Sequence, residues 1–354
     1  MLHLRRICDL IIKRILCALL ACALFVIALP LTSCSRERRQ QITYTDYFDT
    51  VTVFTAYTDK ESFSIMCGEL TSQLRDYHRL LDVYNTYPDV VNLKTLNDSN
   101  GKKMTVDSRL FDFLVWAKEA HQLTNGHTSI ALGALTSLWH NSREMDSPIP
   151  PDYDKLKSAA DHTDIDSLIL DRTDKSVCLS DPELRLDAGA LAKGYVADIV
   201  CQIIAEAGFT DFLLNLGGNV KAVGKKTNEE NWRVGIDDPF NLRNSICTVD
   251  LKNASLVTSG SYQRYFDYNG TRYHHIINKD TLYPQNTFVS VSVLCSSSAI
   301  SDALSTALFN LSFVEGLSLL DALDDVEVLW IFSDKAEPIR YTEGFEKYFK
   351  DTDK

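Results

Sequence analysis

The order of the expected secondary-structure elements constrains the fold of this chain most. Apolar residues follow strand-like or helix-like periods along most of the chain, and no internal repeat or domain boundary interrupts them. Helices are predicted over residues 61–83, 108–123, 130–139 and 299–323, strands over 48–57 and 327–332, a strand–helix alternation over 164–220, and mostly β structure over 232–293. Helices and strands in this order predict one α+β domain, with mixed or antiparallel sheets flanked by helices.

The first 33 residues are typical of a targeting segment. Four basic side chains precede an uncharged apolar run from Ile15 to Leu31, and two small residues then precede Cys34. This end resembles the lipobox of bacterial lipoproteins, in which the cysteine is lipidated and becomes the first residue. An uncleaved membrane helix and a plain signal peptide are the alternatives.

A lipoprotein agrees best with the short apolar run and the polar residues that follow it. We therefore expect a signal peptide over 1–33, lipidation of Cys34 and a polar tether over 34–42. The folded domain would then cover 43–354. It would be held at the cell membrane by its lipid anchor and would face the periplasm or the exterior.

Composition excludes some functions for the processed chain. Removing residues 1–33 leaves 32 basic and 47 acidic side chains, a net charge of -15. Such an acidic protein is not expected to bind nucleic acid. The five remaining cysteines have no metal-ligand spacing, and we expect free, buried thiols at Cys67, Cys178, Cys201, Cys247 and Cys295.

The segment from Asp187 to Tyr195 combines an acidic residue, several small residues and Lys193 just before a helical pattern. Amides at a helix start attract anions, small side chains allow close approach to the backbone, and the lysine adds a mobile positive charge. Taken alone, the segment fits a site for a phosphorylated ligand and a tight turn with a solvated lysine equally well.

Two later segments offer backbone and hydroxyl groups to a ligand. Gly217-Gly218 follow an apolar strand and permit positive φ, although an ordinary turn is the simpler interpretation. Thr258-Ser259-Gly260 and the nearby Arg264 suit contacts to phosphate or ribose.

The C-terminal third also holds candidates for proton transfer and metal binding. In a predicted strand over 273–277 the two histidines point to opposite faces, so we take His275 as the candidate base and His274 as a surface residue. Asp302 and Thr306 lie one helical turn apart and form a possible corner for a hard cation. A helix-start carboxylate and a back-bonded threonine would have the same spacing.

Five motifs follow one another between residues 187 and 307: Asp-x-Gly-Ala-x-Ala-Lys-Gly-Tyr, Asn-x-Gly-Gly-Asn-Val, Thr-Ser-Gly-x-Tyr-x-Arg-Tyr-Phe, His-Ile-Ile and Asp-Ala-Leu-x-Thr-Ala. In this order they resemble the ApbE family, the FAD:protein FMN transferases, many of which are lipoproteins. The resemblance extends over roughly residues 43–335, which implies one ApbE-like domain.

The resemblance also implies a set of site residues. The family's metal contacts match the carbonyl of Ala190 and the side chains of Asp302 and Thr306. Its flavin contacts match Phe48, Tyr87, Asp187, Lys193 and Ile276. The AMP half of FAD would lie against His127, Thr128 and Ser129 and against residues 258–264, which include Thr258, Ser259, Gly260 and Arg264.

Two segments depart from the family pattern. His127-Thr128-Ser129 stand where the family usually has Ala-Phe-Asp, which puts the adenine side of the pocket in question. The pattern His-Ile-Ile-Asp-Pro-x-Thr-Gly becomes His-Ile-Ile-Asn-Lys-Asp-Thr-Leu over 275–282, which loses a carboxylate, a proline and a glycine.

The activity implied by the resemblance is Mg²⁺-dependent transfer of FMN from FAD to a threonine hydroxyl of an acceptor flavoprotein, with release of AMP. His275 would take the hydroxyl proton, or Asp187 would orient the approach. The expected partners are FAD, an acceptor with a threonine flavinylation motif, and the membrane. Two alternatives stay open: a lipoprotein that binds or stores FAD, and an FAD diphosphatase that needs no protein acceptor.

Overall fold

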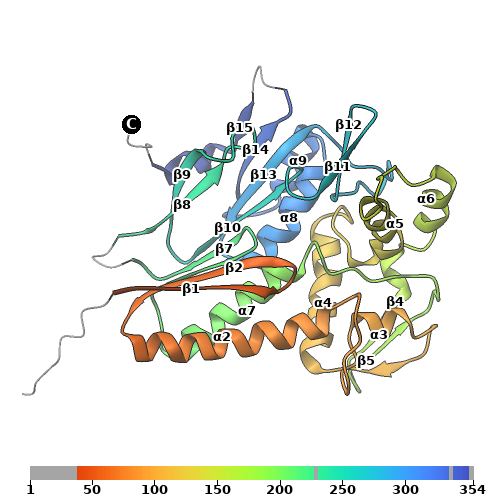
Figure 1. Cartoon of the computed structure of the whole chain (residues 1–354), viewed down its shortest axis with the longest axis horizontal. Coiled ribbons are helices and arrows are strands. Elements are labelled where there is room, and N and C mark those ends of the chain that lie inside the picture. Colours follow the sequence, from red (N-terminus) through yellow and green to blue (C-terminus); the bar gives the residue numbers. More distant parts are fainter. Residues whose placement is uncertain (1–37, 227–229, 335–337, 351–354) are drawn as a thin grey trace, which may run out of the picture. The chain divides into compact units, whose positions relative to one another are not determined.

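An eight-stranded antiparallel sheet runs through the described part of the chain, which comprises residues 38–226, 230–334 and 338–350 of a computed structural model (Figure 1). Its strand order is β1-β2-β6-β7-β10-β13-β14-β15, so the sheet follows the order of the chain. The strands are β1 (Arg38–Tyr47), β2 (Thr50–Thr58), β6 (Phe212–Leu216), β7 (Asn219–Val223), β10 (Ala254–Gly260), β13 (Phe288–Cys295), β14 (Glu327–Phe332) and β15 (Ile339–Tyr341). The predicted α+β class with antiparallel sheets flanked by helices is confirmed.

Three long helices pack against this sheet: α2 (Lys60–Leu81), α7 (Ala192–Glu206) and α8 (Ser298–Asn310) (Figure 1). Helix α2 buries a stripe that includes Met66, Leu70 and Leu74 at helical spacing. This stripe joins Phe54 of β2 and Phe212 of β6 in the largest apolar core. The core therefore fixes the β2–β6 end of the sheet against α2 and α7.

The other elements surround this frame. The helices are α3 (Leu93–Asn97), α4 (Ser108–Leu123), α5 (Gly133–Arg143), α6 (Tyr153–Ala160), α9 (Phe313–Leu320) and the 3-10 turns η1 (Ile130–Leu132), η2 (Ile165–Ser167) and η4 (Glu343–Tyr348). Two three-stranded sheets contain β3 (Met104–Thr105), β5 (Ser176–Leu179) and β4 (Leu168–Asp171), and β16 (Phe349–Lys350), β9 (Ser245–Leu251) and β8 (Trp232–Asp237). A separate hairpin joins β11 (Tyr265–Tyr268) to β12 (Thr271–His274).

Helices α7 and α8 cap each other's N-terminal ends. The Asp302 carboxylate of α8 accepts a hydrogen bond from the Gly194 N–H of α7 at 2.8 Å. In return, the Asp198 carboxylate of α7 accepts bonds from the Ser298 and Ala299 N–H groups of α8, at 3.0 and 2.9 Å. Each carboxylate satisfies amides that have no partner within their own helix, so the two helices are held at a fixed register.

The structure corrects several predictions about where elements begin and end. Strand β1 begins at Arg38, so residues 38–42 belong to the sheet and not to a tether. The final helix is not continuous over 299–323, because Leu311 leaves helical geometry and Ser312 starts α9 with a capping box to Glu315. The signal peptide, Cys34 and residues 34–37 lie outside the described residues.

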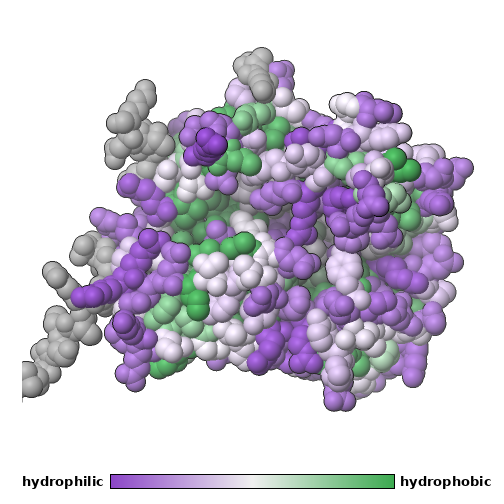
Figure 2. Space-filling model, viewed as in Figure 1, coloured by the Kyte–Doolittle hydropathy of each residue, from purple (hydrophilic) through white to green (hydrophobic). Residues whose placement is uncertain are grey.

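Most of the face shown in Figure 2 carries hydrophilic side chains, in keeping with the charge of the chain. Within the described ranges no helix has both the length and the apolar character needed to cross a membrane. Cys67, Cys178, Cys201, Cys247 and Cys295 are free, as predicted, but Cys67, Cys178 and Cys247 are only partly buried.

His274 is buried, at 2 % exposure, and not a surface residue as the sequence suggested. Its Nε2 bonds the Gln285 carbonyl at 3.0 Å, and its Nδ1 accepts from the Ile276 N–H at 3.2 Å. The second bond requires an unprotonated Nδ1, so the folded protein favours the neutral ring. Burial lowers the pKa of His274 to about 4.

This histidine should make the fold less stable in mild acid. Between about pH 4 and 6.5 the histidine binds a proton in the unfolded chain but not in the folded chain. The neutral His274 therefore contributes fully to the stability of the fold above pH 6.5, and this contribution falls as the pH drops through this window. The free energy of unfolding is measured by urea titration at pH 7 and at pH 5. Between these two pH values, His274→Gln should lose about 2 kcal/mol less of this free energy than the wild type loses. Hydrogen bonding to Asp181 raises the pKa of His162, so His162→Gln is a control that should not reduce the loss. Equal losses in wild type and His274→Gln would contradict the assignment.

Candidate active site

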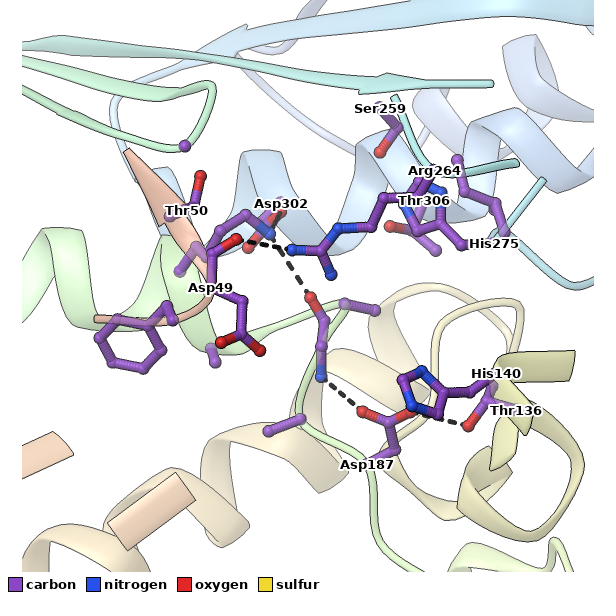
Figure 3. A pocket seen from close by; sticks show the side chains of 18 of the residues that line it. Asp49, Thr50, Thr136, His140, Asp187, Ser259, Arg264, His275, Asp302 and Thr306 are labelled. Carbon is purple, nitrogen blue, oxygen red and sulfur yellow. Dashed lines mark hydrogen bonds and ion pairs between the residues drawn. The ribbon is translucent and has the colours of Figure 1, made fainter. Parts of the chain in front are cut away.

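A cavity of about 300 Å³ opens where the ends of β7 and β10, the start of α7, helix α8 and the 127–143 region meet. Figure 3 shows side chains from these distant segments pointing into it. Every flavin-binding, metal-binding or catalytic residue predicted from the sequence except Tyr87 lines this pocket: Phe48, His127, Thr128, Ser129, Asp187, Ala190, Lys193, Thr258, Ser259, Gly260, His275, Ile276, Asp302 and Thr306.

Asp187 organises the turn that leads into α7. Its Oδ1 accepts a bond from the Gly189 N–H at 2.9 Å, and its Oδ2 accepts from the Thr136 hydroxyl at 2.7 Å (Figure 3). Because each carboxylate oxygen already holds a donor, Asp187 is better placed to shape the 187–190 turn than to take a proton from a substrate.

Asp302 and Lys193 place opposite charges on the pocket wall. Asp302 is only 3 % exposed, and burial raises the pKa of its carboxyl group against the opposing influence of Lys193 and the Gly194 amide. The Lys193 Nζ lies 3.9 Å from the Asp302 Oδ1 and 3.4 Å from the Gly189 carbonyl. Thr306 follows one helical turn after Asp302, and no protein group among the described residues bonds its hydroxyl. Asp302 and Thr306 therefore lie on the same face of α8, as their spacing predicts, and this face lines the pocket.

His275 faces the pocket, whereas His274 packs away from it. Strand β12 ends at His274, so the predicted strand over 273–277 is too long, but the two rings still diverge. Burial lowers the pKa of His275 to about 3, with smaller contributions from His274 and from the positive charges of Arg264, Lys193 and Arg143. Its buried Nδ1 has no hydrogen-bond partner within the described chain. The low pKa keeps the ring neutral near pH 7, so one of its two nitrogens carries no proton.

The predicted hydroxyl groups are mostly bound within the protein. Thr128 donates to the Ala303 carbonyl of α8 at 2.7 Å, and the Ser129 hydroxyl accepts from the Ala131 N–H at 3.2 Å. The Thr258 and Ser259 hydroxyls bond serine hydroxyls of β13 and α8, at 2.7 and 2.8 Å. These side chains give the pocket its shape and can offer a ligand only their remaining hydrogen-bond capacity.

Tyr87 does not line the pocket in this structure, and Tyr84 takes its place there. The Tyr87 hydroxyl donates to the Asp82 Oδ2 at 2.7 Å, and Asp82 also accepts from the Tyr84 N–H at 2.7 Å. The Tyr84 ring lies 5.2 Å from the His140 ring. The Asp82 network thus folds one tyrosine of the loop back onto the protein and leaves the other at the pocket.

Sequence reasoning missed several residues that line the same pocket. These include Asp49, Thr50, Thr136, His140 and Arg143. The sequence held a signal for two of them, Thr136 and His140 on α5. Their i, i+4 spacing places them on one face of the helix. Asp49 and Thr50 follow Phe48 in a Phe-Asp-Thr pattern of the family, from which only Phe48 was predicted, and they reach the pocket because β1 and β2 turn back there.

The departures over 275–282 preserve the turn by other means. The Asn278 Oδ1 accepts bonds from the Asp280 and Thr281 N–H groups, at 2.9 and 3.0 Å, as an aspartate would. Leu282, at the position of the family's glycine, adopts a φ of 66°. Its carbonyl accepts from the Trp139 indole at 3.0 Å, which holds this left-handed conformation against its steric cost.

The model of the ApbE family matches residues 46–330 of the chain. The chain belongs to the ApbE family. An FAD:protein FMN transferase from Treponema pallidum is 35% identical over 259 residues, 69% of this chain and 71% of that protein. Another protein of that name, from Klebsiella pneumoniae, is 32% identical over 73% of this chain and 79% of its own. The family resemblance proposed from the motifs is confirmed.

Solved ApbE structures share the fold. The ApbE protein of Thermotoga maritima aligns with a TM-score of 0.80 at 23% identity, over 88% of this chain and 100% of that chain. The flavin transferase ApbE of Vibrio cholerae aligns with a TM-score of 0.73 at 22% identity, over 88% and 100% of the two chains. The ApbE arrangement of sheet and helices is therefore present in this chain.

Proposed function

We propose that this ApbE-family protein is an enzyme that transfers FMN from FAD to a threonine hydroxyl of an acceptor flavoprotein. A bond forms between the hydroxyl oxygen and the phosphorus on the FMN side, the phosphoanhydride bond breaks, and AMP leaves. The observation that carries this proposal is the convergence of Asp302, Lys193 and His275 on one pocket. The names of the curated relatives support the same activity.

Oxygen donors from α8 and from the turn before α7 fit a hard cation. Asp302 supplies a buried carboxylate, Thr306 a hydroxyl without a protein partner in the described chain, and Ala190 a main-chain carbonyl on the facing turn. The described residues contain no group of three His, Cys, Asp or Glu side chains that could hold a metal by itself. Mg²⁺ suits such a site, since it commonly keeps water and substrate phosphates among its ligands. When bound, it would offset the negative charge that develops on the phosphates.

The remaining groups of the pocket have complementary tasks. Lys193 is placed to bind an anionic oxygen, and the Asp187 turn holds the backbone before α7 close to the ligand. His275 lines the pocket, and its ring, which is neutral near pH 7, is the candidate to take the hydroxyl proton of the acceptor. Nearby cations contribute to the low pKa of His275, and a bound pyrophosphate would offset their charge and make the ring a stronger base.

We also propose that the protein is a lipoprotein held at the membrane through Cys34, facing the periplasm or the exterior. The basic start, the apolar run and the small residues before Cys34 support this location. Expression of Cys34→Ala should yield an unprocessed or soluble form. A variant with wild-type mass in the membrane fraction would exclude lipidation.

One incubation tests the transfer reaction. The domain starting at residue 36 is mixed with FAD, Mg²⁺ and a flavoprotein fragment that carries a candidate acceptor threonine. We expect AMP release together with a fluorescent flavin–protein band, and both should vanish with EDTA or with a Thr→Ala acceptor. AMP release without an acceptor would favour the diphosphatase alternative. Tight FAD binding without AMP release would favour the storage alternative.

A further inference from the structure

Arg264 connects two segments that lie on different sides of the pocket mouth (Figure 3). Its guanidinium donates from Nη2 to the main-chain carbonyl of Asp49 at 2.9 Å, although the two residues are 215 positions apart. Its own carbonyl accepts from the His275 N–H at 3.1 Å. One residue therefore links the turn between β1 and β2 with the segment that presents His275.

The turn that Arg264 holds is unfavourable for its own residues. Phe48 and Asp49 form the two-residue turn between β1 and β2, and both have positive φ, 56° and 49°. This pattern matches a type I′ turn, which favours glycine and asparagine and disfavours bulky side chains. Outside contacts compensate: the Phe48 N–H donates to the His78 Nδ1 at 3.2 Å, and Arg264 binds the next carbonyl.

The Arg264 guanidinium makes no ion pair within the described chain. A single hydrogen bond, to the Asp49 carbonyl, holds its side chain across the pocket. Lys193 and Asp302 line the same pocket. A guanidinium carries five N–H donors, so it can keep the Asp49 carbonyl and still bind another acceptor in the pocket.

We infer that Arg264 is a positioning residue that clamps the Phe48–Asp49 turn closed, so that Phe48 is fixed relative to His275 when the dinucleotide binds. The identity of that ligand rests on the proposed function. The clamp itself rests only on the contacts of Arg264, and it can be tested without any ligand.

The first test measures amide hydrogen exchange in the ligand-free protein over the peptide that contains Phe48. Arg264→Gln should speed exchange there, because the turn opens more often when the clamp is lost. Arg272→Gln is the matched control, since Arg272 lies on the same hairpin but stacks on Tyr265 and pairs with Asp267 outside the pocket. Equal exchange in the two variants would overturn the clamp.

The second test combines Arg264→Gln with Asp49→Gly and measures FAD affinity. Glycine keeps the carbonyl and readily adopts positive φ, so the turn should close without the clamp. Arg264→Gln should weaken binding about tenfold in the wild-type background and less than about threefold beside Asp49→Gly. The same loss in both backgrounds would assign Arg264 a charge contact alone and overturn the inference. If no variant binds FAD, the proposed function fails, while the exchange experiment still decides the clamp.

Discussion

Replacing Asp302 with alanine should reduce flavin transfer on the order of a hundred-fold or more. Asp302 is the one buried carboxylate of the proposed cation site, and it also caps α7 through the Gly194 amide at 2.8 Å. Asp302→Asn separates these roles, because its amide oxygen can still accept that bond but carries no charge. Both variants should therefore lose transfer, while Asp302→Asn stays closer to the wild type in stability.

Two neighbouring substitutions serve as comparisons. Thr306→Ala removes a neutral oxygen and should reduce transfer less than Asp302→Ala. Lys193→Ala should weaken FAD binding more than it slows the chemical step, because its charge also serves the bound ground state. The measurement is transfer rate and FAD affinity, with and without EDTA, alongside thermal unfolding. Full transfer by Asp302→Asn, or by the wild type in EDTA, would mean that Asp302 only caps α7.

Gly194→Ala should be among the most destabilising single substitutions in the described chain. A Cβ at Gly194 would lie 2.5 Å from the Asp302 Cβ and would also collide with the Ser298 carbonyl. Neither neighbour can move freely, because both belong to α8, whose start is capped by Asp198. We expect a loss of about 3 kcal/mol of unfolding free energy, measured by urea titration, together with a loss of FAD binding as α8 shifts.

The matched control is Gly68→Ala. Gly68 lies within α2, and nothing would come within 4 Å of an added Cβ. Alanine is the better helix former, so this variant should gain about 0.5–1 kcal/mol. If Gly194→Ala were as stable as Gly68→Ala, the close α7–α8 packing described here would be wrong.

Long amphipathic helices were the part of the fold most visible in the sequence. Helix α4 runs over Ser108–Leu123 as predicted, because an apolar period and the Asp107 cap coincide there. The break between α8 and α9 had a readable signal, since Ser312 and Glu315 have capping-box spacing, but the apolar run across it hid the break. Strand β1 begins with polar residues, as exposed edge strands often do, and only its pairing with β2 reveals it.

The candidate site was predictable where short motifs carried it. Asp187, Lys193 and Asp302 could be named because the family pattern marks them, and the structure brings them to one pocket. The sequence could not predict that Tyr84, and not Tyr87, lines the pocket. This arrangement depends on the hydrogen bonds that Asp82 accepts in the folded chain. Arg264 stood out as a phosphate or ribose contact, but its bond to Asp49 joins residues that only the folded chain brings together.

The pocket draws its walls from almost the whole length of the chain, from Phe48 near the start to Thr306 on α8. The sheet can grow strand by strand from its N-terminal end, because its strand order follows the chain. A chain that ended at Cys295 would already contain β1 to β13 but would lack Asp302 and Thr306. Under the proposed function, FAD binding therefore requires that the last long helix has docked, and it comes after the sheet from β1 to β13 has formed.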